Sequence, residues 1–236
     1  MTSHLSLVHP LELQDPSRGA LARSSLIAAA VDVFGEHGVS DATTREIARR
    51  AGQNISTIAY HFGNKEGLYA AVIAYINAII LRRYAKLFDE IDAFLAGPKH
   101  PPARCLDLFG QLLSNSAATH REVLAVSSII VREQSHPTKA FAVLFDGSLK
   151  RLQRAGSDLI DVYTQHPRGS EETTVRFHAI LGQSLVFRNA RATIMRGLGW
   201  QEVGEREEQL IERVVVEQAL DVLRALRVRR SKQKKA

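Results

Sequence analysis

Hydrophobic positions recur along the chain with a helical period from about Ala20 onwards. One apolar face at spacings i, i+3, i+4 and i+7 is formed by Ile27, Ala30, Val31 and Phe34. Gly38 follows and predicts the end of this helix, because glycine adopts the left-handed backbone with which many helices end. Residues 1–18 show no sustained periodicity, and we expect a flexible N-terminal arm there.

Two short helices are predicted next. Thr43 and Glu46 have the spacing of a capping box, with Thr43 as the cap and Glu46 reaching back to it. The helix that follows is expected to bury Ile47, Ala48 and Ala51. Gly52 then suits a sharp turn, and a second short helix over Ile55–His61 presents Ile55 and Ile58 inward.

A long helix is predicted from Lys65, with Asn64 as its cap, to about Leu95, where Gly97-Pro98 and Pro101-Pro102 stop it. Further helical patterns cover residues 103–118, 121–134, 138–164, 171–196 and 204–227. No stretch has the alternation of a strand, so the sequence predicts an all-α fold with three small N-terminal helices and a larger helical body.

Ala48, Gly52 and Ile58 together indicate a helix-turn-helix. Two helices that cross steeply need a small residue at their contact, a tight turn needs glycine, and the second helix needs an apolar anchor. Such a motif places its second helix in the major groove of DNA. The outward side chains of that helix can hydrogen-bond to bases or phosphates, and they are Ser56, Thr57, Tyr60 and His61. A polar face that simply meets solvent is the alternative interpretation.

Lys65 lies in the first turn of the long helix, where the helix dipole disfavours a cation. A DNA phosphate bound there would remove that penalty, since free backbone amides and the lysine would bind it together. Glu66 already compensates part of the dipole.

The segment from Ala42 to Ala48, then Ala51-Gly52, then Ile58 to Leu68 resembles the signature of TetR-family transcriptional regulators. The match extends over residues 25–72. The resemblance implies that Thr44 and Arg45 contact bases or backbone and that His61 and Lys65 contact phosphates. It also implies that four residues of the second short helix face the groove: Ser56, Thr57, Ala59 and Tyr60. At Ala59 many members of the family carry a larger side chain.

The later segments around Arg132-Glu133-Gln134, Phe177–Gln183 and Arg196–Trp200 resemble the CecR-type subgroup of that family. The predicted elements, together with this resemblance, give a domain layout of arm 1–18, DNA-binding domain 19–64, ligand-binding and dimerisation domain 65–227 and basic tail 228–236. The resemblance also implies a cavity for a small-molecule inducer, which we expect to be drug-like. We expect its lining to include Phe109, Leu113, Ile129, Phe141, Phe145, Phe177 and Phe187, with Arg132, His178 and Gln183 as polar groups. For any single aromatic residue, plain core packing is the alternative.

The resemblance also implies that apolar stripes on the last two helices pair with those of a second copy. The stripes consist of Val175, Leu181 and Phe187 on one helix and Ile211, Val214, Val215 and Val222 on the other. Core packing within one chain is the alternative interpretation.

Charge and composition add less to the functional prediction than the helix pattern and the resemblance do. The net charge of +6 arises outside the predicted DNA-binding segment, because residues 1–75 carry 6 basic and 7 acidic side chains. Six basic residues between Arg227 and Lys235 are expected to form a solvated tail. The single cysteine, Cys105, excludes an internal disulfide and is expected to be an inert helix residue. We expect a cytoplasmic protein without signal peptide, cofactor or metal site.

The sequence therefore predicts a homodimeric, ligand-responsive regulator, most simply a repressor, that binds a palindromic operator and no membrane. Activation of transcription remains open. One alternative is an interaction protein of the same fold that regulates a partner protein with DNA as a scaffold. Another is a helical enzyme, against which the lack of a recognisable catalytic motif argues.

Overall fold

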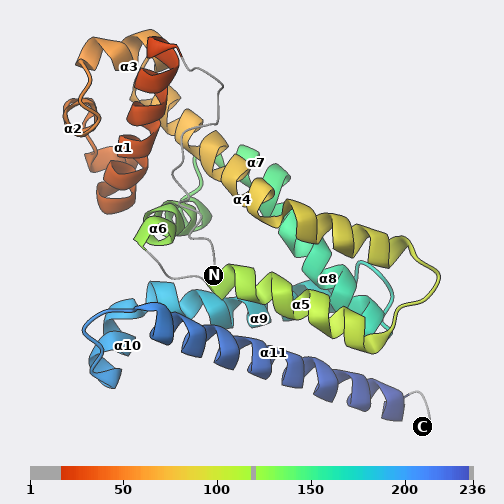
Figure 1. Cartoon of the computed structure of the whole chain (residues 1–236). Coiled ribbons are helices and arrows are strands. Elements are labelled where there is room, and N and C mark those ends of the chain that lie inside the picture. The colour runs from red at the N-terminus through yellow and green to blue at the C-terminus, as the bar shows by residue number, and fades with distance from the viewer. Residues whose placement is uncertain (1–16, 118–120, 234–236) are drawn as a thin grey trace. The chain divides into compact units, whose positions relative to one another are not determined.

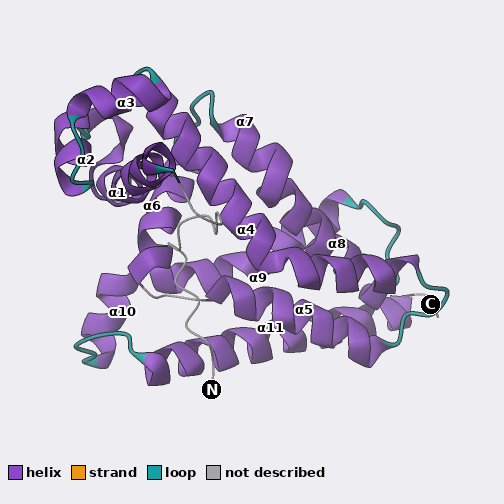
Figure 2. Ribbon diagram, turned by 45° about the horizontal axis from the view of Figure 1, so that its top comes forward, coloured by secondary structure: helices purple, strands orange, loops and turns teal. Residues whose placement is uncertain are grey.

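The computed structural model describes residues 17–117 and 121–233, and every regular element in these ranges is a helix (Figures 1 and 2). The elements are α1 (Arg18–Asp41), α2 (Thr44–Arg50), α3 (Ile55–Phe62), α4 (Lys65–Ala96), α5 (Pro102–Ala117), α6 (Arg121–Ser135), α7 (Phe141–Leu144), the π-helical turn η1 (Phe145–Leu149), α8 (Lys150–Thr164), α9 (Glu171–Asn189), α10 (Arg191–Leu198) and α11 (Glu205–Gln233). The all-α prediction is confirmed. The arm expected over residues 1–18 lies almost entirely outside the described residues.

The chain forms two compact units. The head unit comprises the residues up to Leu81 together with Arg121–Ser148, and the body unit comprises the remainder. The chain crosses between the units at residues 81/82, 120/121 and 148/149. The first of these crossings lies within the long helix α4.

Helix α6 packs against α1 in the head unit. Gly35 allows their close approach, because a Cβ atom at this position would lie 3.0 Å from the carbonyl oxygen of Ala125. A buried polar cluster joins α6 to α4: the Glu133 carboxylate accepts a 2.7 Å hydrogen bond from the Tyr69 hydroxyl and a 3.1 Å bond from the Thr138 amide. Burial, together with this bond, raises the pKa of the Tyr69 hydroxyl above its ordinary range.

The first part of α4 belongs to the core of the head unit, where Leu68, Val72, Ile73 and Ile76 are fully buried. By length and composition alone, α4 is apolar enough to cross a membrane. Its buried residues supply a simpler reason for that composition, since a core helix needs the same side chains.

The body unit is built around α5, which contacts each of α8, α9 and α11. Its core includes Phe109, Leu112 and Leu113 on α5, all fully buried. Gly156 on α8 touches the ring of Phe177 on α9 so closely that a Cβ atom there would lie 2.1 Å from the ring. This glycine lets the two helices pack with a phenylalanine between them.

Three predicted helices differ from the observed ones. The segment 138–164 is divided by η1, where the Ser148 amide donates a 2.7 Å hydrogen bond to the Asn77 side chain of α4. The segment 171–196 breaks at Ala190, whose backbone leaves the helical region without a glycine or proline. The last helix continues beyond residue 227 to Gln233, so most of the predicted basic tail is helical.

Candidate DNA-binding interface

The helix-turn-helix has the internal packing that its sequence predicts. Ala48 on α2 and Ile58 on α3 are buried, with exposed fractions of 3 % and 2 %. Gly52 has φ 63°, a left-handed conformation that favours glycine in the turn between the two helices. Asn64 begins α4 as predicted, because its side chain accepts a 2.8 Å hydrogen bond from the Gly67 amide.

The capping box at α2 is half formed. The Thr43 hydroxyl accepts the Glu46 amide at 3.2 Å, as predicted. The Glu46 carboxylate does not reach back but accepts a hydrogen bond from Arg50 at 2.7 Å, and Arg50 also pairs with Glu36 of α1. An arginine one turn later offers this carboxylate a charged partner, which a backbone amide does not.

Asn54 is a cap that the sequence analysis missed. Its side-chain oxygen accepts hydrogen bonds from the Ser56 amide at 3.0 Å and from the Ser56 hydroxyl at 3.1 Å. An asparagine directly before a short amphipathic segment is the available sequence signal. The cap fixes the start of α3, and therefore the side chains that this helix presents.

The outward face of α3 is open to solvent. Tyr60 is 84 % exposed, and Ser56 and Ala59 are also exposed. Thr57 and His61 are partly buried at the edge of this face, and the His61 ring contacts Tyr60 edge-on. On α2, Arg45 is exposed and Thr44 partly so. The predicted DNA-contacting residues of α2 and α3 are thus all exposed or partly exposed.

Lys65 has a contact that the sequence did not indicate. Its ammonium donates hydrogen bonds of 3.2 Å to the carbonyl oxygens of Ser40 and Ala42. These carbonyls lie at the C-terminal end of α1, where a cation is favoured. The side chain thereby leaves the unfavourable end of its own helix. Its role toward a phosphate remains a prediction.

Ile55 was predicted to point inward, and this is wrong. Its exposed fraction is 49 %, whereas Ile58 one turn later is 2 % exposed. Ile55 is the first residue of α3, where the helix emerges from the turn. Periodicity assigns both residues to one face, but it does not show where that face leaves the core.

The residues predicted to line a ligand cavity fall into both units. In the head unit, Ile129 is buried, Arg132 is exposed, and the rings of Phe141 and Phe145 stack at 5.9 Å. In the body unit, the other six are distributed between the core and its edge: Phe109, Leu113 and Phe177 are buried, Gln183 and Phe187 are partly buried, and His178 is exposed and bonded to Gln153.

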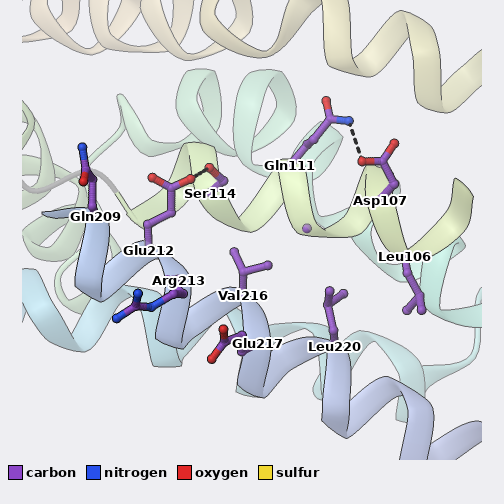
Figure 3. Close-up of a pocket in the computed structure, with 11 residues that line it drawn as sticks. Leu106, Asp107, Gln111, Ser114, Gln209, Glu212, Arg213, Val216, Glu217 and Leu220 are labelled. Atoms are coloured by element: carbon purple, nitrogen blue, oxygen red, sulfur yellow. Dashed lines mark hydrogen bonds between the residues drawn. The ribbon is translucent and has the colours of Figure 1, made fainter. Parts of the chain in front are cut away.

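Two surface hollows are present in the described body unit, and neither is lined by these residues. The first, of about 550 Å³, lies between α5 and α11, with Gly110, Val216 and Leu220 among its lining and the Ser114–Glu212 hydrogen bond at its edge (Figure 3). The second lies along α9 around Val175 and Arg176. The ligand site therefore remains a prediction.

Comparisons with known proteins agree with this architecture. Residues 26–72 match the family of bacterial regulatory proteins of the tetR family, and residues 104–226 match the C-terminal domain of the HTH-type transcriptional dual regulator CecR. The chain is 34 % identical over 200 residues to the transcriptional dual regulator CecR of Shigella flexneri. The aligned residues cover 84 % of this chain and 89 % of the relative.

Similar proteins also include the transcriptional regulator BetI of Klebsiella pneumoniae (strain 342), which is 40 % identical over 58 residues. These residues cover 25 % of this chain and 30 % of BetI. Among solved structures, a regulator assigned to the TetR family from Mesorhizobium loti MAFF303099 superposes with TM-score 0.55 at 17 % identity, covering 89 % of this chain and 98 % of that one. A protein of Clostridium perfringens assigned to fatty acid metabolism regulation gives TM-score 0.57 at 14 % identity, covering 84 % and 97 %. The two matched domains and the long CecR similarity lead to one conclusion: the chain belongs to the TetR family of transcriptional regulators, with a C-terminal domain of the CecR type.

Proposed function

We propose that the protein is a homodimeric repressor that binds a palindromic operator in the cytoplasm and leaves it when a small-molecule inducer binds. The observation that carries this proposal is the outward face of α3. Its large side chain Tyr60 is 84 % exposed while Ile58 on the opposite face is 2 % exposed. A short helix anchored on one face and open on the other is the element that a helix-turn-helix inserts into the major groove.

Footprinting on duplexes selected from a random pool tests the DNA-binding part. Two heads related by a twofold axis should protect two inverted half-sites about 34–36 Å apart, or a multiple of this distance. Tyr60→Ala should weaken binding without unfolding the protein, because this exposed side chain contributes little to the core. Protection of a single, non-repeated site would contradict the dimeric part of the proposal.

Control by an inducer is the second part. The helix α4 contributes to both units and is about 48 Å long at ~1.5 Å per residue, so a small tilt would displace its end appreciably. Linkage requires that an inducer which weakens operator binding also binds the operator complex more weakly, by the same factor. Calorimetry of a drug-like ligand against free and operator-bound protein measures both affinities. Equal affinities would exclude that ligand as the inducer.

A second candidate function is activation at some promoters. It is favoured by the name of the Shigella relative, which is a dual regulator. Transcription from reporters that carry the selected operator upstream of, and overlapping, a promoter distinguishes the two activities. Repression at both positions would reject activation.

A further inference from the structure

The outward face of α3 consists of two parallel rows of different chemistry. Residues four apart on a helix are separated by only about 40° around its axis, so they form a row. One row is apolar and contains Ile55 and Ala59, both exposed. The other is polar and contains Ser56 and Tyr60, also exposed. The surface available to base edges is therefore half aliphatic.

Ile55 stands out in the apolar row. An isolated exposed aliphatic residue is ordinary on a protein surface. This one, however, is 49 % exposed in the first turn of the helix that the proposed function places in the groove. Ala59 beside it is small, so the methyl groups of Ile55 make up most of the apolar row.

The side chains of the polar row limit which DNA bases this face can recognise by hydrogen bonds. The Ser56 hydroxyl donates its proton to Asn54 at 3.1 Å, which leaves its lone pairs to accept a hydrogen bond from a base. No side chain of the two rows carries the guanidinium, ammonium or amide group that reads guanine or adenine by paired hydrogen bonds. The apolar row is the other part of this face that a base edge can meet.

Among the groups that base pairs present in the major groove, the C5-methyl group of thymine is the apolar one. We infer that Ile55, with Ala59 beside it, recognises a thymine methyl group in each operator half-site. This inference rests on the proposed function and adds to it a base and the residue that reads it.

Replacement of thymine by deoxyuridine tests the inference directly, because it removes only the methyl group. Each thymine of the selected operator is replaced symmetrically in both half-sites, and the affinity of the full-length protein is measured by fluorescence anisotropy. At one position the loss should be about fourfold for each methyl contact, the factor that one buried methylene provides, and hence about tenfold to twentyfold for the two half-sites.

Variants of Ile55 identify the reader of that methyl group. Ile55→Ala should bind the thymine and deoxyuridine operators with the same affinity, whereas Ile55→Val should keep most of the difference. Val143→Ala is the matched control: Val143 is 47 % exposed on α7, and this variant should discriminate as the wild type does. Circular dichroism melting checks that each variant is folded.

Three outcomes are decisive. A wild-type protein that tolerates deoxyuridine at every position would overturn the inference, even if every variant misfolded, and would leave operator binding intact. Equal discrimination by the wild type and a folded Ile55→Ala variant would assign the methyl group to another residue and also reject it. Failure to bind any selected duplex would reject the proposed function itself, and the inference with it.

Discussion

At the residue scale, Lys65 has one observed role and one predicted role, and two measurements on the same variant can separate them. Lys65→Ala removes the two hydrogen bonds to the C-terminal end of α1 and should lower the free energy of unfolding by about 1 kcal/mol, less than for a buried charged bond because the site is partly exposed. If Lys65 also contacts a phosphate, the slope of log affinity against log salt should fall by about one for each head.

Urea denaturation and salt titrations of operator binding measure these two effects independently. Lys65→Met is the matched variant, since it keeps most of the aliphatic stem while it removes the charge and both hydrogen bonds. A lower stability with an unchanged salt slope would limit Lys65 to its structural role.

Cys105 on α5 is predicted to be chemically silent. It is 1 % exposed, its thiol donates to the Leu159 carbonyl at 3.2 Å, and burial raises the pKa of the thiol to about 12. A thiol-specific reagent at pH 8 should therefore react slowly with native protein and quickly in guanidinium chloride. Fast reaction of the native thiol would mean that this part of the body unit opens readily.

The same shift has a consequence at alkaline pH. The unfolded thiol ionises near its ordinary pKa of 9.0, whereas the folded thiol stays protonated to about 12. The unfolded state alone therefore loses a proton in this window, and the contribution of the thiol to stability should decline as the pH rises from 9 toward 12. Cys105→Ser should show a shallower decline in this window, since serine does not ionise there.

At the scale of elements, the contact between α8 and α9 depends on a glycine. Gly156→Ala would place a Cβ atom 2.1 Å from the ring of Phe177, which is 1 % exposed. The expected cost is about 1–3 kcal/mol of stability, as for other overpacked cores. Thermal melting followed by circular dichroism measures it.

Gly197→Ala is the control for this change, because a Cβ atom at Gly197 in α10 meets nothing within 4 Å. Alanine should stabilise that helix by up to about 1 kcal/mol. If both variants behaved alike, the close approach at Gly156 would not determine the packing of α8 and α9.

Local signals account for the elements that the sequence predicted well. The Thr43 and Asn64 caps, the Gly52 turn and the buried Ala48 and Ile58 all depend on residues within a few positions of one another. The missed features depend on distant partners. The π-helical turn η1 meets Asn77, which lies about 70 residues earlier in the chain, as the Ser148–Asn77 bond shows.

The features of the candidate site are likewise of two kinds, those set by local sequence and those that depend on distant residues. The open face of α3 follows from its period, whereas the exposure of Ile55 depends on how far the helix emerges from the head, and the position of the Lys65 ammonium depends on the end of α1. Hydrophobic pattern specifies a face of a helix. It does not specify which other element covers that face, and this is why the expected ligand lining also stays untested.

At the scale of the whole molecule, assembly follows from what α9 and α11 leave uncovered. Of the stripes expected to pair with a second copy, Ile211 and Val215 are buried inside the chain, which assigns them to its core. Val175 and Val222 remain exposed, at 64 % and 38 %. Val175→Asp combined with Val222→Asp should therefore give a folded monomer that has lost tight operator binding.

Sedimentation velocity and circular dichroism together test this prediction. Val143→Asp on α7 is the matched control, since it adds a charge to an exposed valine elsewhere in the chain and should leave the dimer intact. Tight operator binding by the double variant as a well-folded monomer would contradict the dimeric mode of DNA recognition.

The head unit consists of two separate stretches of the chain, and this determines when it can be completed during synthesis. Its first part ends at Leu81 and its second part begins at Arg121, so the ribosome adds the intervening residues of the body unit first. At roughly 5–20 residues per second, this takes about 2–8 s. During that interval the side of α1 around Gly35, which later receives α6, has no partner. The α1 face of the head unit is therefore covered by α6 only after residues 82–120 have been added to the chain.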